Sequence, residues 1–139
     1  MRILVSACLL GENCKYSGGN NRNQKVLDFV KGHEVIPVCP EVLGGLPIPR
    51  IPCEIRCGIV TNREGVSCDR EFRAGAQMAL EIAKKQKVDL AILQSRSPSC
   101  GVKQIYSGNF DGTLVEGSGV FAAMLKETGI RVIDAEDLG

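Results

Sequence analysis

The apolar positions of the chain gather in four short runs that have the pattern of buried β-strands. These runs cover residues 3–5, 34–38, 89–93 and 130–133. Within each run the hydrophobic residues follow one another without alternation, which is typical of strands covered on both faces in a parallel sheet. We therefore expect four strands that lie in the interior of the protein.

Three helical patterns lie between these runs, over residues 23–30, 70–86 and 119–128. The second pattern has apolar residues at helical spacing, namely Phe72, Ala76, Ala79, Leu80 and Ala83. Asp69 is expected to cap its start, and Gly129 is expected to close the third helix in a left-handed conformation. Alternating strands and helices predict right-handed crossovers. The expected fold is α/β, a three-layer sandwich with a short, mostly parallel, Rossmann-like sheet.

One segment interrupts this alternation. Residues 37–52 contain so many prolines and glycines that the pattern excludes a regular helix. Residues 53–68 predict a short hairpin with its turn at residues 62–65. We expect residues 40–69 to form a small hairpin and loop flap beside the sheet, within a single α/β domain that spans residues 1–139. Long loops in a compact domain usually serve a function.

Composition narrows the class of protein. The chain has 139 residues, 44% of them hydrophobic, which suits one ordinary domain with a packed core. Its formal net charge is +1 and no block of basic residues occurs, so a nucleic-acid partner is not indicated. No apolar run approaches the length of a membrane helix, and the first residues lack the pattern of a secretory signal. A cytoplasmic location is the expectation.

Seven cysteines are the most unusual feature of the composition. A reducing cytosol would keep their thiols free. Three of them, Cys8, Cys39 and Cys100, each follow a predicted strand. Because the carboxyl ends of parallel strands meet at one edge of a sheet, where α/β proteins bind ligands, we expect these three sulfurs to share one crevice.

Three converging thiolates are soft ligands that select zinc, copper(I) or iron–sulfur clusters. The Cys-x2-Cys pairs common in structural zinc sites are missing from the sequence. Three widely spaced cysteines suit a [4Fe–4S] cluster better, and they would leave one iron open as a Lewis acid. The plain alternative is that the cysteines pack as small hydrophobes. That is our interpretation of the remaining four, Cys14, Cys53, Cys57 and Cys68, of which Cys14, only six residues beyond Cys8, is the first candidate for an exception.

Several motifs occur in order along nearly the whole chain. They are SACLLG at residues 6–11 with the segment 14–19, CPE at 39–41 with its continuation to 52, SPSCG at 97–101, and the segments 105–112 and 117–123. Together they resemble a small bacterial family, formerly of unknown function, that includes thiouracil desulfurases. The chain departs from the family pattern at Lys15 and Ser17, where the family usually has Arg and Asp.

The resemblance implies that Cys8, Cys39 and Cys100 hold a [4Fe–4S] cluster. It also implies a non-redox desulfuration, in which the thiocarbonyl sulfur of a thiolated pyrimidine such as 2-thiouracil binds the open iron and water attacks the carbon. Glu41, two residues after Cys39, is the candidate acid–base group. It could instead pair with a nearby arginine, Arg50.

A serine beside Cys100 completes the implied site. Ser97 is the candidate that hydrogen-bonds the base or relays a proton, and Ser99 competes for this role. The implied partner is a small thiolated base or nucleoside, and the sequence indicates no acceptor for the released sulfur.

Two other functions are alternatives for this sequence. A non-catalytic iron–sulfur or metal-binding protein would use the same three cysteines. A phosphatase or arsenate reductase would use Cys8 as nucleophile and needs an arginine six residues later to hold the oxyanion. That position is Cys14, and the following Lys15 lacks the planar fork of arginine, so the phosphatase is disfavoured.

Overall fold

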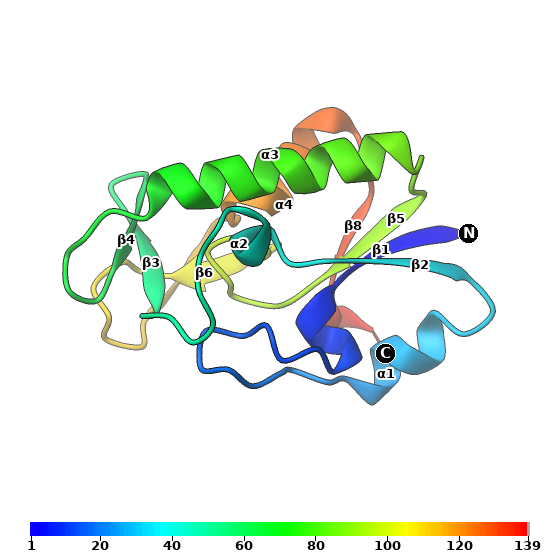
Figure 1. The fold of residues 1–139 in the computed structure, drawn as a ribbon, viewed down its shortest axis with the longest axis horizontal. Helices are drawn as coiled ribbons and strands as arrows, with labels where there is room; N and C mark the ends of the chain where they lie inside the picture. The colour runs from blue at the N-terminus through cyan, green and yellow to red at the C-terminus, as the bar shows by residue number, and fades with distance from the viewer. Residues whose placement is uncertain (139) are drawn as a thin grey trace.

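A four-stranded parallel sheet forms the centre of the protein, whose computed structural model describes residues 1–138. The strands are β1 (Arg2–Ser6), β2 (Glu34–Val38), β5 (Leu90–Leu93) and β8 (Val132–Asp134), in the order β2-β1-β5-β8 (Figure 1). Each pair is parallel, and Leu4 of β1 lies opposite Ile36 on one side and Ala91 on the other. The predicted α/β fold class is confirmed.

Two hydrophobic clusters cover the two faces of this sheet. Leu4 and Ala91 point to one face, where they pack with residues of α3 (Asp69–Lys85) and α4 (Val120–Thr128). Ile3 and Val5 point to the other face, where Val26 of α1 (Gln24–Phe29) covers them. Burial of such side chains stabilises the fold by about 1.5–3 kcal/mol each. Helices on both faces give the expected three layers.

The chain reverses its direction across the sheet at β1. From β1 it passes to β2 on one side, and it then crosses through α3 to β5 on the other. This reversal is a topological switch point, where the loops that follow neighbouring strands separate and leave room for a ligand. The short 3₁₀ helix η1 (Ala7–Leu10) follows β1 at this point, and η2 (Ala135–Asp137) follows β8.

The end of one helix agrees with the sequence prediction, whereas the start of another does not. α4 closes at Gly129 with φ 85°, as predicted. The start of α3 is capped by Cys68, so the prediction that Asp69 is the N-cap was wrong. Asp69 is the first helical residue instead. Its carboxylate accepts the Val60 N–H at 3.0 Å and pairs with Arg73 at 2.6 Å, which connects the preceding segment at Val60 to the start of the helix.

Residues 37–52 contain one helical turn, α2 (Pro40–Leu43), although the sequence appeared to exclude regular helix there. Pro40 occupies the first helical position, where a missing N–H costs nothing. The turn packs backbone to backbone on α3: a Cβ on Gly75 would lie 1.7 Å from the Pro40 carbonyl oxygen, and one on Gly44 would lie 2.0 Å from that of Glu71. The lack of a side chain at these two positions therefore allows α2 to pack closely against α3.

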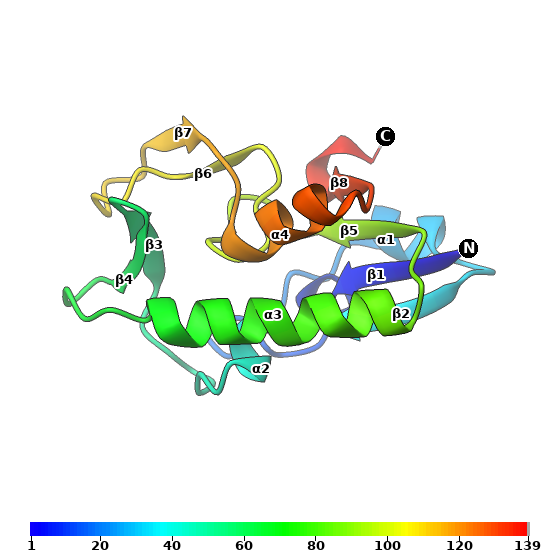
Figure 2. The same ribbon diagram turned by 90° about the horizontal axis from the view of Figure 1, so that it is seen from above.

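Two antiparallel hairpins stand at one end of the molecule (Figure 2). The first consists of β3 (Cys53–Arg56) and β4 (Ile59–Asn62); its turn lies at Cys57 and Gly58, earlier than the predicted residues 62–65. The second, β6 (Gln104–Tyr106) with β7 (Leu114–Glu116), was not predicted. Glu54 joins the hairpins, because its carboxylate accepts the N–H groups of Gly108 and Phe110.

Within residues 1–138, every helix is too short or too polar to cross a lipid bilayer.

Candidate functional site

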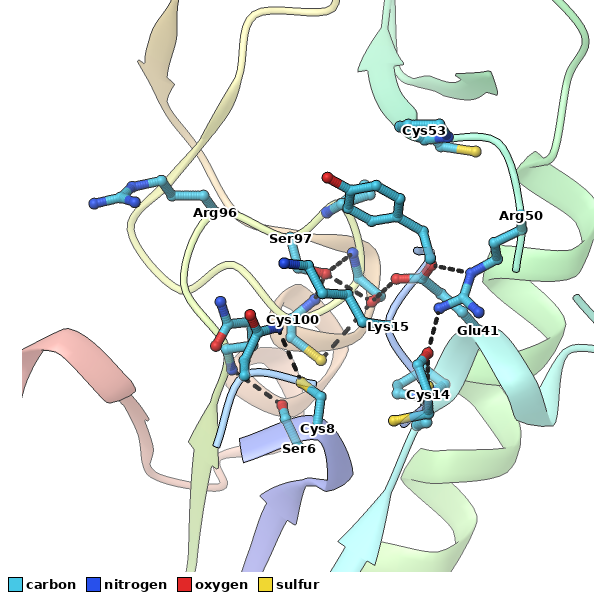
Figure 3. A pocket seen from close by; sticks show the side chains of 18 of the residues that line it. Ser6, Cys8, Cys14, Lys15, Glu41, Arg50, Cys53, Arg96, Ser97 and Cys100 are labelled. Atoms are coloured by element: carbon cyan, nitrogen blue, oxygen red, sulfur yellow. Dashed lines mark hydrogen bonds and ion pairs between the residues drawn. The ribbon is translucent and has the colours of Figure 1, made fainter. Parts of the chain in front are cut away.

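A cavity of about 420 Å³ opens at the carboxyl ends of β1, β2 and β5. The two hairpins contribute its outer wall through Cys53, Tyr106 and Phe110. The inner wall contains Cys8, Cys39 and Cys100, together with Glu41 and Ser97 (Figure 3). The structure thus brings to one cavity all five residues that the sequence analysis selected.

Cys8 lies in η1, directly after β1. Gly11 ends this short helix at φ 98°, a conformation that favours glycine. The returning chain then places Asn21 against Cys8. The Asn21 backbone N–H donates to the Cys8 carbonyl at 3.0 Å, and its side-chain amide donates to the Cys8 sulfur at 3.5 Å. No sequence motif had indicated this contact.

Cys39 sits between β2 and α2 and is the N-cap residue of that helical turn. Its sulfur lies 3.9 Å from the Cys14 carbonyl oxygen. The same carbonyl accepts a hydrogen bond from Arg50 Nη2 at 2.8 Å, and Cys14 lines the cavity beside Cys8 and Cys39. Cys14 is therefore part of the site rather than a packing residue. The sequence signal for this is its position six residues after Cys8.

The loop that carries Cys100 is held by the start of α4. The N–H groups of Val120 and Phe121 donate to the carbonyls of Pro98 and Ser99 at 2.8 and 2.9 Å. A Cβ on Gly119 would lie 2.5 Å from the Ser99 carbonyl carbon, so glycine permits this close approach. The first N–H groups of α4 therefore bind the Cys100 loop, and the Gly-Ser-Gly motif serves to position it.

Two serines in this loop have different surroundings. The Ser97 hydroxyl oxygen accepts the N–H groups of Ser99 and Cys100 at 3.1 and 3.0 Å, which shapes the turn. Ser99 is only 1% exposed, and its hydroxyl donates to Glu41 Oε2 at 2.9 Å. The two hydroxyl oxygens are 2.9 Å apart. The direct neighbour of Glu41 is thus Ser99, with Ser97 one hydrogen bond further away.

The pairing of Glu41 with Arg50, which the sequence left open, is present. Arg50 Nε donates to Glu41 Oε1 at 3.0 Å, and the two side chains are only 6% and 15% exposed. Each carboxylate oxygen thus has one protein partner. Because a carboxylate oxygen has two lone pairs, each keeps capacity for one more hydrogen bond on the cavity side.

The cysteine thiols differ in acidity. Hydrogen bonds from the Cys14 thiol lower the pKa of Cys8, and they lower the pKa of Cys39 to about 7, while the pKa of Cys14 itself is raised. Complete burial raises the pKa of Cys100 to about 12 in the metal-free chain. Cys39 is thus the thiol that ionises readily at neutral pH, whereas Cys100 needs a cation beside it to do so.

The arrangement of the donor side chains bears on which metal group the cavity can hold. Among residues 1–138, no three His, Cys, Asp or Glu side chains are close enough to bind one metal ion together. An iron–sulfur cubane places its ligands on separate irons, so its cysteines need only surround a common space. Three cysteines that follow three strands and line one cavity fit such a cluster. Glu41 and Ser97 line the same cavity (Figure 3).

Comparisons with known proteins agree with this geometry. The family model described as 2-thiouracil desulfurase matches residues 3–137. The uncharacterised protein YbbK of Bacillus subtilis (strain 168) is 38% identical over 146 aligned positions, which cover 98% of this chain and 97% of YbbK. The solved structure of the [4Fe-4S]-dependent thiouracil desulfidase TudS is similar with a TM-score of 0.92 and 38% identity, over 99% of this chain and 92% of that one. This chain belongs to the 2-thiouracil desulfurase family.

Proposed function

We propose that this protein is a [4Fe–4S]-dependent desulfurase that replaces the sulfur of a thiolated pyrimidine, such as 2-thiouracil, with oxygen. The observation that carries the proposal is the meeting of Cys8, Cys39 and Cys100 with Glu41 in one cavity. Family membership and the similarity to TudS support the cofactor and the reaction. The overall change is C=S plus water to C=O plus hydrogen sulfide, with no net oxidation.

Cys8, Cys39 and Cys100 are the residues that would hold the cluster. Cys8 and Cys39 directly follow β1 and β2, and Cys100 lies in the loop after β5 that the start of α4 holds, so the fold brings all three to one cavity. With three protein ligands, the cluster would supply one open iron as a Lewis acid that polarises a carbon–sulfur bond. The hydrogen bond from Asn21 to the Cys8 sulfur would stabilise that residue as a thiolate.

Glu41 is the group that would manage the protons of the attacking water. Its carboxylate is held on one side by Arg50 and on the other by Ser99, and its free lone pairs are available to a water in the cavity. The same residue can return the proton to the base nitrogen or to the departing sulfur, because each of these atoms becomes more basic as the carbon–sulfur bond breaks.

Ser97 and Ser99 link the cavity to this carboxylate. Since the Ser97 oxygen already accepts two N–H groups, its own hydrogen can point to Ser99, and the Ser99 hydrogen points to Glu41. This order of donors forms a path for a proton from Ser97 to Glu41. Ser97 can also donate to a carbonyl or nitrogen of the bound base.

The outer part of the cavity is suited to a planar ring. Tyr16, Tyr106 and Phe110 line it, and aromatic faces bind nucleobases by stacking. A base or a nucleoside is the substrate class that this wall favours.

The proposal is tested with protein purified without oxygen. We expect about four irons per chain, and equal amounts of uracil and sulfide formed from 2-thiouracil as the thiocarbonyl absorbance disappears. A loaded cluster without turnover of any thiolated pyrimidine or nucleoside would reject the enzyme and favour the metal-binding alternative. Turnover by metal-free protein would reject the role of the cluster.

A further inference from the structure

We infer that Arg50 is the positioning residue of this site: it fixes the direction of the Glu41 carboxylate and joins that carboxylate to the loop that carries Cys14. The inference rests on the proposed function, because it gives Glu41 a role in the reaction. Arg50 itself is a residue that the proposed acid–base step does not use, since its guanidinium contributes only hydrogen-bond donors to the site.

The guanidinium of Arg50 is almost enclosed. Its side chain is 6% exposed, and each of its three nitrogens has a different partner. Nε donates to Glu41 Oε1 at 3.0 Å, Nη1 to the Pro47 carbonyl at 3.2 Å, and Nη2 to the Cys14 carbonyl at 2.8 Å. Surface ion pairs are mobile and contribute little, whereas a buried charge with several fixed partners has one preferred geometry.

The backbone of Arg50 strengthens the same connection. Its N–H donates to the Tyr16 carbonyl at 2.7 Å. Residue 50 is thus bound twice to the segment that follows Cys8, once through Cys14 and once through Tyr16. This segment carries Cys14, whose carbonyl oxygen lies 3.9 Å from the Cys39 sulfur and which lines the cavity beside Cys8. A shift of Arg50 would move the carboxylate and this segment together.

The opposite side of the carboxylate shows why such a support is needed. Ser99 donates to Oε2, but its own position depends on a loop that is anchored on α4. One hydrogen bond leaves a carboxylate free to rotate about its side-chain torsions. A second, charged donor on Oε1 removes that freedom. This matters because a catalytic carboxylate displaced by about 1 Å can lower the reaction rate up to about a hundredfold. Arg50 supplies this second donor.

Lysine cannot replace this arrangement. An ammonium group is a single point, so it cannot place donors at once on Glu41, Pro47 and Cys14 in three directions. Arg50→Lys keeps the charge and loses the fork, while Arg50→Met loses both. A comparison of these two variants separates the effect of the charge on activity from the effect of the donor geometry.

The test measures kcat, KM and iron per chain for the loaded wild-type protein, Arg50→Lys and Arg50→Met. Arg73→Met is the matched control, because Arg73 also pairs with a carboxylate, Asp69, but lies outside the cavity. We expect Arg50→Met to lower kcat about tenfold to a hundredfold, with KM changed by less than about threefold. Arg50→Lys should fall between Arg50→Met and wild type, and Arg73→Met should match wild type.

Two further readouts distinguish positioning from a general loss of structure. Millimolar guanidinium ion should restore part of kcat in Arg50→Ala and none in Arg73→Ala. Hydrogen exchange of the amides of Lys15 and Gly18 should quicken in Arg50→Met, because the Cys14 carbonyl loses its donor. Unchanged exchange would reject the connection to the Cys14 loop.

The outcomes separate this inference from the proposed function. If the wild-type protein converts no thiolated pyrimidine, the proposed function fails. If the wild type is active and Arg50→Met keeps its kcat at full iron content, the inference fails and the proposed function stands. A fall in activity that follows the iron content alone, without rescue by guanidinium, would also reject the positioning role.

Discussion

Ser99 and Glu41 stand 58 positions apart in the sequence, and the Ser99 hydroxyl donates to Glu41 Oε2 at 2.9 Å. The bond connects the helical turn α2, which follows β2, with the loop that follows β5. Each of these segments also carries a cysteine, Cys39 at the N-cap of α2 or Cys100 in the loop. The carboxylate is therefore placed relative to both sulfurs by the same contact, which makes its geometry sensitive to changes in either segment.

Replacement of the cavity cysteines should remove the cluster. In Cys8→Ala, Cys39→Ala and Cys100→Ala we expect iron and sulfide per chain to fall to background, together with the visible absorbance of the cluster, because a cubane with two protein ligands is released. Cys57→Ala is the control, since Cys57 is exposed in the β3–β4 turn. Full iron content in any of the three cavity variants would remove that cysteine from the ligand set.

Two substitutions of Glu41 should differ in their effects. Glu41→Gln keeps one oxygen for Arg50 and turns an NH2 group to Ser99, whose hydroxyl oxygen can accept from it. We therefore expect near-normal iron content and melting temperature with kcat at least about a hundredfold lower. Glu41→Ala leaves the buried Arg50 charge without an opposite charge, which costs about 3–5 kcal/mol of stability. Kinetics and thermal unfolding check both. A Glu41→Gln enzyme with unchanged kcat would exclude Glu41 as the acid–base group.

The thiols of the metal-free chain should react in a defined order. Because the pKa of Cys39 is about 7 and that of Cys100 about 12, iodoacetamide at pH 7 should modify Cys39 well before Cys100. The Cys39 rate should rise with pH through about 7. In Cys14→Ala the main hydrogen bond that stabilises the Cys39 thiolate is lost, so this rise should move to higher pH. Peptide mapping by mass spectrometry measures each rate, and an unmoved Cys39 profile in Cys14→Ala would contradict the role of Cys14.

Asp69 should make the fold sensitive to acid. Although partial burial opposes its ionisation, hydrogen bonds from Arg73 and the Val60 N–H lower its pKa below the ordinary 3.8. A carboxyl group with a lowered folded-state pKa stabilises the fold above the ordinary value, and this contribution disappears as pH falls through the folded-state pKa. Asp69→Asn should therefore lower the melting temperature at pH 7, and the difference from wild type should shrink below about pH 4. A difference that is constant with pH would contradict this assignment.

The sequence predicted the sheet and the main helices because their signals are local. Continuous apolar runs and the spacing of Phe72, Ala76 and Leu80 depend only on which residues face the core. The three strand-end cysteines followed from the general rule that parallel strands end at one edge. The sequence pattern does not reveal the short helix α2, because proline usually breaks helices, whereas Pro40 stands at a first helical position where it is tolerated.

The contacts that refine the site could not be predicted in the same way. The bond from Asn21 to the Cys8 sulfur and the fork of Arg50 around Cys14 join side chains whose relative positions depend on the packing of several loops. Ser97 and Ser99 were both candidates in sequence. Only the turn geometry, in which Ser97 accepts two N–H groups, shows which hydroxyl reaches Glu41. The second hairpin, β6 with β7, has strands of three residues each, too short for a pattern to be recognised.

The strand order β2-β1-β5-β8 has a consequence for how the protein matures. Cys100 reaches the other two sulfurs only after β5 has docked beside β1, and β5 is made late in synthesis, after the long helix α3. A cluster held by Cys8, Cys39 and Cys100, as proposed, would therefore form only on a chain in which β5 has docked. The cluster content of a preparation would then report how much of it has reached its native topology.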